Sequence, residues 1–115
     1  MQALLIYKIV PAALWDAAKR DGAFTGAPVD LADGYIHFST AEQAYETAAK
    51  HFAGQADLLL LAIDVRALTP DDLKWEPSRG GALFPHLYAP LPVSAVVWEK
   101  PLPWNGERHL FPELA

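Results

Sequence analysis

Residues 33–40 read Asp33-Gly34-Tyr35-Ile36-His37-Phe38-Ser39-Thr40, a turn and an alternating strand that run straight into a helix start. Successive side chains of a strand point to opposite faces, so Tyr35, His37 and Ser39 share one face. The apolar residues between them belong to the other face, where they can anchor in a core. The pattern predicts a polar strand face turned toward a cleft, next to the N-terminus of a helix.

A second stretch repeats this arrangement. Residues 83–88 read Leu83-Phe84-Pro85-His86-Leu87-Tyr88, and a period of two places Phe84, His86 and Tyr88 on one face. Two of the four histidines of the chain therefore lie in the middle of a strand, between aromatic or hydroxyl-bearing neighbours. We expect the polar faces of the two strands to line one cleft.

The order of the expected elements predicts a single α+β domain over residues 1–115, with a mostly antiparallel sheet, continuous or split, and two main helices in the N-terminal half. Residues 23–33 are expected to form a loop, and residues 101–115 an irregular tail packed on the domain. The expected strands are 4–10, 35–39, 58–65, 73–76, 84–88 and 93–100, and the expected helices run from Pro11 to about Arg20 and from about Thr40 to Gly54.

The second helix has two candidate starts, because Thr40 with Gln43 and Ser39 with Glu42 both fit the capping-box pattern. Along this helix Gln43, Thr47 and His51 form a polar row. Residues 58–65 are apolar except for one aspartate, which predicts a central strand buried on both faces.

Composition excludes several classes of function. The formal net charge is -5, and the nine Lys and Arg residues form no basic cluster, so a nucleic-acid partner is not expected. The chain has no cysteine, which removes disulfides, zinc-thiolate sites and thiol nucleophiles. No apolar run reaches the roughly 20 residues of a membrane helix, and the first residues lack signal-peptide features. We expect a cytoplasmic protein with no membrane partner.

The central functional hypothesis joins the two histidine strands across one cleft. We assign catalysis to His37, Ser39, Glu76 and His86, ligand binding to Lys8, Tyr35, Thr40, Gln43, Phe84 and Tyr88, and no metal site. The N-terminus of the helix near Thr40 offers N–H donors that suit a phosphate or carboxylate. The residues alone leave the cofactor unknown and indicate an anion or a polar small molecule as the partner.

A structural interpretation competes with this one. Ser39 and Thr40 can simply cap the helix, while His37 and His86 can be half-buried sheet residues whose ring nitrogens bond to the backbone or to each other. Lys8 fits a solvated strand residue better than a ligand contact. His51 and His109 are expected to be structural or solvent-facing. His37, His86 and Glu76 are metal-ligand types, but no HxH or HExxH motif brings them together.

The two motifs IHFST and FPHLY, together with Tyr7-Lys8-Ile9 and Trp75-Glu76, resemble a small bacterial family called domain of unknown function 952. The resemblance covers nearly the whole chain with order and spacing intact. It implies a shared fold and shared positions and leaves the reaction open.

This family is in turn distantly similar to the ADP-ribosyltransferase group, whose members bind NAD in a cleft of a split antiparallel sheet. The similarity implies that Lys8 stands where that group has His or Arg, that Ser39 matches its Ser or Tyr, and that its glutamate corresponds to Glu76 or Glu99. Lysine cannot reproduce the planar hydrogen bonding of His or Arg. The implied activity is transfer of ADP-ribose from NAD; the alternatives are a non-catalytic module that binds a small molecule or nucleotide and a protein-interaction domain.

Overall fold

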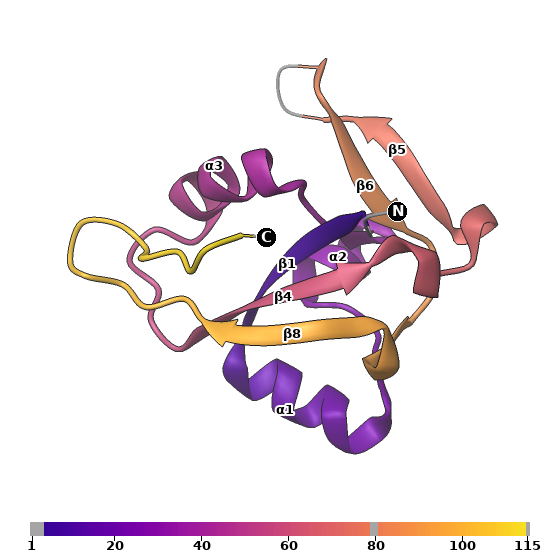
Figure 1. Ribbon diagram of the computed structural model, residues 1–115, viewed down its shortest axis with the longest axis horizontal. Coiled ribbons are helices and arrows are strands. Elements are labelled where there is room, and N and C mark those ends of the chain that lie inside the picture. The colour runs from indigo at the N-terminus through magenta and orange to yellow at the C-terminus, as the bar shows by residue number, and fades with distance from the viewer. Residues whose placement is uncertain (1–3, 79–80, 115) are drawn as a thin grey trace.

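The computed structural model describes residues 4–78 and 81–114, so the ends of the predicted domain, residues 1 and 115, lie outside it. The chain forms an α+β domain of three helices and three small antiparallel sheets (Figure 1). The helices are α1 (Ala12–Asp21), α2 (Pro28–Asp33) and α3 (Ala41–His51). The strands are β1 (Leu5–Pro11), β2 (Ala23–Phe24), β3 (Ile36–His37), β4 (Leu58–Asp64), β5 (Leu73–Pro77), β6 (Leu83–Leu87), β7 (Leu91–Pro92) and β8 (Val96–Pro101), and single 3-10 turns cover 65–67, 70–72 and 93–95.

The main sheet has the order β1-β4-β8, with β4 in the centre as the apolar run predicts. Its two faces carry separate cores. Ile6 and Val10 alternate with Tyr7 and Ile9 along β1, and the first pair packs with Trp15 of α1. The second pair packs with Ala44 and Ala48 of α3, so α1 and α3 cover opposite faces of this sheet (Figure 1).

A second three-stranded sheet, in the order β3-β6-β5, stands beside the first. Within residues 4–78 and 81–114, the backbones of the two sheets are joined at one place, where Tyr7 and Ser39 exchange hydrogen bonds of 2.7 and 2.9 Å. The antiparallel sheet is therefore split, and β1 forms the edge of the first sheet along the split.

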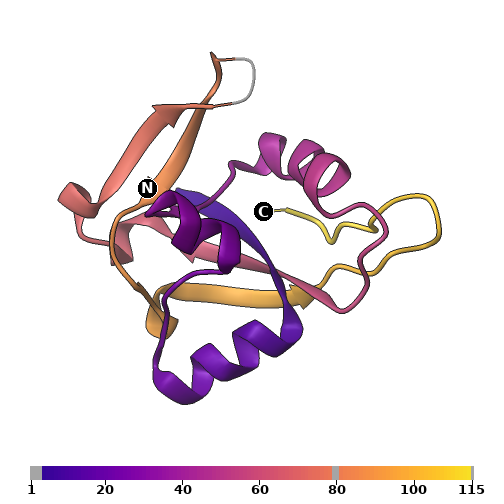
Figure 2. The same cartoon turned by 180° about the vertical axis from the view of Figure 1, so that it is seen from behind.

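Two expectations for residues 23–39 need correction. The expected loop contains the short strand β2 and the six-residue helix α2, which begins at a proline suited to the first turn of a helix. The expected strand 35–39 is regular only at Ile36–His37, because Ser39 leaves β6 and bridges to Tyr7 instead. Figure 2 shows α2 from behind, on the side of the main sheet that faces the viewer.

The helix start at Thr40 follows one of the two predicted capping boxes. Thr40 Oγ1 accepts a hydrogen bond from the Gln43 backbone N–H at 3.2 Å, and Gln43 Oε1 accepts one from the Thr40 N–H at 3.0 Å. α1 ends at Gly22, whose φ of 87° lies in the left-handed region that favours glycine. After β8 the chain has no further helix within the described residues, and Leu102 of this segment is fully buried.

Candidate functional site

The two sequence-predicted histidines lie directly opposite each other, because β3 and β6 pair with His37 against His86. Their side chains project from the same face of the second sheet, and the ring centroids are 5.5 Å apart in an edge-to-face arrangement. The alternation read from the two motifs accounts for this, since it placed each histidine on the polar face of its strand. What the sequence could not supply is the pairing register that brings the two together.

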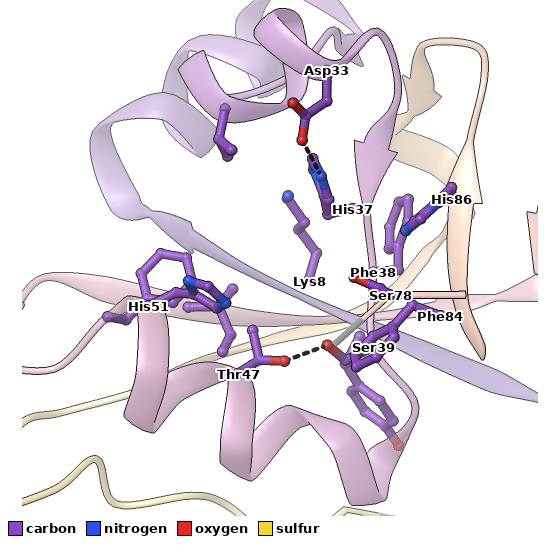
Figure 3. A pocket seen from close by; sticks show the side chains of 14 residues that line it. Lys8, Asp33, His37, Phe38, Ser39, Thr47, His51, Ser78, Phe84 and His86 are labelled. Carbon is purple, nitrogen blue, oxygen red and sulfur yellow. Dashed lines mark hydrogen bonds and ion pairs between the residues drawn. The ribbon is translucent and has the colours of Figure 1, made fainter. Parts of the chain in front are cut away.

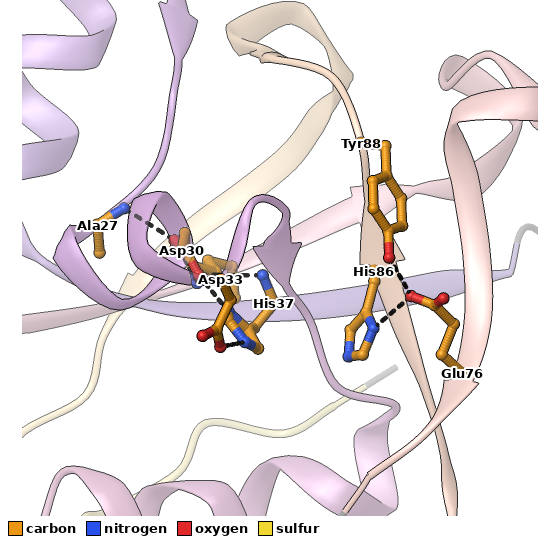
Figure 4. A network of polar contacts seen from close by, with 8 residues as sticks. Ala27, Asp30, Asp33, His37, Glu76, His86 and Tyr88 are labelled. Carbon is orange, nitrogen blue, oxygen red and sulfur yellow. Dashed lines mark hydrogen bonds and ion pairs between the residues drawn. The ribbon is translucent and has the colours of Figure 1, made fainter.

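His37 is held between two aspartates (Figure 4). Its Nδ1 lies 2.6 Å from Asp30 Oδ1, and its Nε2 lies 2.8 Å from Asp33 Oδ2. A carboxylate only accepts hydrogen bonds, so with both carboxyls ionised both ring nitrogens carry a proton. Both ring nitrogens of His37 are therefore in use.

Asp30 is the centre of a buried polar network that the sequence analysis did not identify. It is 1% exposed and pairs with Lys8, whose Nζ lies 3.0 Å from Oδ2 and 3.1 Å from Oδ1. It also accepts hydrogen bonds from the backbone N–H groups of Ala27 and His37. Burial acts to raise the pKa of the Asp30 carboxyl, but the His37 bond, the Lys8 charge and the two N–H groups outweigh it and lower the pKa to about 2.

The expectation that Lys8 is solvated is therefore wrong. Lys8 is 6% exposed, and it projects from β1 toward α2, where Asp30 meets it. Burial lowers the pKa of the Lys8 ammonium, while the charge and hydrogen bond of Asp30 act in the opposite direction. A buried lysine normally needs such a partner, but the partner lies in a segment that the sequence predicts as a loop.

The Asp30 network predicts a loss of stability in acid. The folded-state pKa of about 2 lies below the ordinary value of 3.8, so the contribution of this group is complete above about pH 4 and is lost as the pH falls through about 2. It amounts to about 2 kcal/mol, from 1.36 kcal/mol for each pH unit. Urea unfolding of the wild type and of Asp30→Asn measures it, and the stability gap between them should narrow by that amount between about pH 5 and pH 2. A gap that stays constant with pH would contradict the assignment.

His86 is held by a third carboxylate, that of Glu76 (Figure 4). His86 Nδ1 lies 2.8 Å from Glu76 Oε1, and the Tyr88 hydroxyl donates to the same oxygen at 2.7 Å. The Tyr88 bond, followed by the His86 bond, lowers the pKa of the Glu76 carboxyl. The same bond to Glu76 raises the pKa of Tyr88 to about 12. Tyr35 stacks on the His86 ring, with centroids 4.1 Å apart and planes inclined by 25°.

A cavity of about 450 Å³ opens beside this pair, where β1 and the second sheet part (Figure 3). Lys8, His37, Ser39 and His86 line it together with aromatic side chains that include Phe38 and Phe84. From α3, Thr47 and His51 complete the wall, and Thr47 Oγ1 lies 3.0 Å from Ser39 Oγ. The cavity thus combines a largely apolar wall with a few polar groups, the usual make-up of a small-molecule site.

Five of the sequence-predicted site residues line this cavity directly: Lys8, His37, Ser39, Phe84 and His86. Glu76, Tyr35 and Tyr88 contact the His86 ring or each other and support the wall from behind. Glu99, the alternative to Glu76, lies elsewhere, since it accepts hydrogen bonds from Trp15 Nε1 and Lys19 Nζ.

Thr40 and Gln43 lie outside the cavity wall. Their side chains complete the capping box, and Gln43 Nε2 donates to the Leu83 carbonyl at 2.8 Å. The side chains that were expected to contact a ligand at the start of α3 are therefore bonded to the backbone of the protein.

This position gives a prediction for Thr40→Ala. The variant is expected to lose about 1 kcal/mol of unfolding free energy, the usual cost of removing a threonine N-cap, and to keep the ligand affinity of the cavity. Thermal unfolding checks the first part and a binding titration the second. If Thr40→Ala binds ligand as weakly as a cavity-lining variant does, with no change in its unfolding free energy, Thr40 contacts the ligand after all.

Four polar residues of the site were not predicted from the sequence: Asp30, Asp33, Thr47 and His51. Thr47 and His51 belong to the polar row that also contains Gln43, so the spacing on α3 already marked them. The row was not assigned because only the packing of α3 against β1 shows which part of it meets the cavity. Asp30 had no comparable signal in the sequence.

The described residues hold no group of three or more His, Asp or Glu side chains placed to bind a metal ion. None of the helices in the part of the chain that the structure describes has the length and apolar character that crossing a membrane requires.

Comparisons with known proteins give a family and no reaction. Residues 9–99 match the model of a family described as "Protein of unknown function (DUF952)". The crystal structure of protein CC0527 from Caulobacter crescentus is similar at 59% identity and a TM-score of 0.87, with 91% of each chain covered. The solution NMR structure of CC0527 is similar at 58% identity and a TM-score of 0.80, covering 91% of this chain and 90% of that one. No curated protein matches the chain.

Proposed function

The chain belongs to the family described as "Protein of unknown function (DUF952)", and from the geometry of its site we propose that it binds a nucleotide-type ligand in the cavity between its two sheets, with NAD as the first candidate. The observation that carries the proposal is the gathering of His37, His86, Ser39 and Lys8 around one cavity of about 450 Å³ at the split of the sheet. The absence of cysteine favours a cytoplasmic setting.

The size and lining of the cavity support a ligand with a planar ring and hydroxyl groups. Small-molecule sites have volumes of about 300–1,000 Å³, so this cavity accommodates a nucleoside half of NAD with the remainder at the opening. Phe38 and Phe84 offer aromatic surface for a ring. Ser39, Thr47 and His86 offer polar groups close to it.

The charges around the cavity favour a ligand whose charge lies outside it. Lys8 and His37 are the basic side chains at this side of the cavity, and Asp30 and Asp33 pair with them. With all four groups ionised, the network has no net charge. A phosphate deep in the cavity would have no unpaired cation of this network to meet, whereas the uncharged nicotinamide or adenine ring and its ribose fit.

Transfer of ADP-ribose from NAD is a second candidate function. The position of the cavity in a split antiparallel sheet favours it, since the ADP-ribosyltransferase group binds NAD in such a cleft. The contacts of Glu76 argue against this transfer reaction, because the carboxylate already accepts hydrogen bonds from both Tyr88 and His86. In the ADP-ribosyltransferase group the glutamate carboxylate orients the ribose hydroxyls, whereas here the Glu76 carboxylate orients the His86 ring. A binding module is therefore the preferred proposal.

The protein-interaction alternative has less support. A partner surface would have to use the aromatic and proline-rich residues 84–104, and this segment buries Phe84, Leu87, Leu91 and Leu102. These side chains belong to the cavity wall and the cores, so they form no continuous exposed surface.

One assay separates binding from transfer. Protein is mixed with NAD, binding is followed by isothermal titration calorimetry, and released nicotinamide is measured by chromatography. The proposal predicts a saturable heat of binding and intact NAD. Release of nicotinamide at a rate that depends on protein concentration would instead show that the protein cleaves NAD, as a transferase does. Absence of any saturable binding of NAD would remove it as the ligand.

A further inference from the structure

One ring nitrogen of His86, Nε2, has no hydrogen-bond partner in the described residues and can bond to a ligand. His86 is 3% exposed and lines the cavity. Its Nδ1 is bonded to Glu76, and Figure 4 shows the other ring nitrogen turned away from that carboxylate. Within residues 4–78 and 81–114, Nε2 has no hydrogen-bond partner. A buried polar atom without a hydrogen-bond partner lowers the stability of the fold. A ligand in the cavity can supply the missing partner of this nitrogen.

Glu76 fixes which nitrogen of the neutral ring carries the proton. An ionised carboxylate can only accept, and Glu76 is kept in that form because the Tyr88 hydroxyl also donates to its Oε1. In the neutral imidazole the proton therefore sits on Nδ1, and Nε2 is a hydrogen-bond acceptor. The stacked ring of Tyr35 holds the plane of the imidazole, so the acceptor keeps a fixed direction.

The other polar groups near His86 do not offer the same feature. Both nitrogens of His37 face carboxylates, and Lys8 faces Asp30. Ser39 and Thr47 share a hydrogen bond. Among these groups the acceptor of His86 alone is both buried and directed at the ligand space.

We propose that His86 is the specificity-determining residue of the cavity and that, through Nε2, it accepts a hydrogen bond from a neutral donor of the ligand, a sugar hydroxyl or an amide N–H. The inference rests on the proposed function for the kind of ligand and goes beyond it by assigning which part of that ligand enters the cavity. An ionised phosphate oxygen has no proton to give, so its lone pairs would oppose that of Nε2. The ribose or carboxamide end enters, and the phosphates stay outside.

The state of the ring is measurable without any ligand. Long-range ¹H–¹⁵N NMR spectra of the His86 ring, recorded over a pH series until the ring signals reach their plateau at high pH, are expected to show an unprotonated Nε2. Glu76→Ala should move proton occupancy toward Nε2, because nothing then holds the proton on Nδ1. Glu46→Ala is the matched control, since it removes a carboxylate that pairs with Lys50 on α3, outside the cavity wall, and leaves the bond between Glu76 and His86 in place. A protonated Nε2 in the wild type would overturn the proposal.

Titration with four probes then tests the ligand class. NAD, nicotinamide and ribose are expected to shift the His86 Nε2 resonance in a saturable way. Inorganic sulfate, whose oxygens are all ionised and carry no proton, is expected to leave it unchanged. Glu76→Ala should weaken NAD binding about tenfold, the effect of one lost hydrogen bond, whereas Glu46→Ala should bind NAD as the wild type does.

The outcomes separate this inference from the proposed function. If NAD binds but leaves Nε2 unchanged, or if sulfate shifts Nε2 as strongly as ribose, the inference is overturned and NAD binding stands. If NAD fails to bind while ribose or nicotinamide shifts Nε2, the choice of NAD is wrong and the assignment of His86 holds. If no donor-bearing probe shifts Nε2, the inference is overturned.

Discussion

Replacing Asp30 by alanine is expected to lower the free energy of unfolding by about 3–5 kcal/mol, the loss typical of removing one partner of a buried ion pair. The substitution leaves the Lys8 ammonium, 6% exposed, without its carboxylate. It also takes the acceptor from the backbone N–H groups of Ala27 and His37. Because these bonds connect α2, β1 and β3, the cost should appear as a loss of global stability in urea unfolding followed by circular dichroism.

Lys8→Met provides the matched control. Methionine is of similar length and carries no charge, and Asp30 keeps its bonds to His37 and the backbone, so we expect a smaller loss than for Asp30→Ala. The double variant should be more stable than the sum of the two single losses predicts, because the unpaired ammonium is gone. A loss below about 1 kcal/mol for Asp30→Ala, or strict additivity, would show that the buried pair does not hold these elements together.

Replacing His86 by phenylalanine is expected to weaken NAD binding at least about 100-fold, since a buried donor on the ligand would then lose its acceptor. Phenylalanine keeps a ring against Tyr35, so the stacking and the filling of the cavity wall are retained. The fold is checked by circular dichroism and the affinity by calorimetry.

His109→Gln is the control for this variant. His109 is also buried, but it lies near the C-terminal end of the chain and outside the cavity wall. Its Nε2 is bonded to the backbone carbonyl of Gln55. The His109→Gln variant should bind NAD with the wild-type affinity. Equal affinity of His86→Phe and the wild type would remove His86 from the binding site.

Local patterns predict much of the fold because they report interactions between residues near in sequence. The alternation in the two motifs indicates which side chains share a face, and the apolar run 58–65 indicates the central strand that β4 forms. The capping-box pattern offered two starts for α3, and the choice of Thr40 became visible only in the structure. The split of the sheet could be stated only as an alternative, since it depends on where Ser39 leaves β6 for β1.

The polar network of the site depends on contacts between segments far apart in sequence, which no local pattern reports. Asp30 is 22 residues from Lys8 and meets it only because α2 packs on β1. The choice between Glu76 and Glu99 likewise follows from strand pairing, because β5 pairs with β6 while β8 pairs with β4. The sequence therefore predicted the two histidines and left their carboxylate partners undetermined.

The most direct measurement is an NMR titration of the protein with NAD, following the backbone amides and the histidine side chains. Binding in the cavity between the sheets predicts saturable shifts at His37, Ser39 and His86, with the signals of His109 and of the exposed face of α1 unchanged. If NAD at millimolar concentration moves none of the cavity signals, or moves only signals away from the cavity, the account of this site as a nucleotide-binding cavity is wrong.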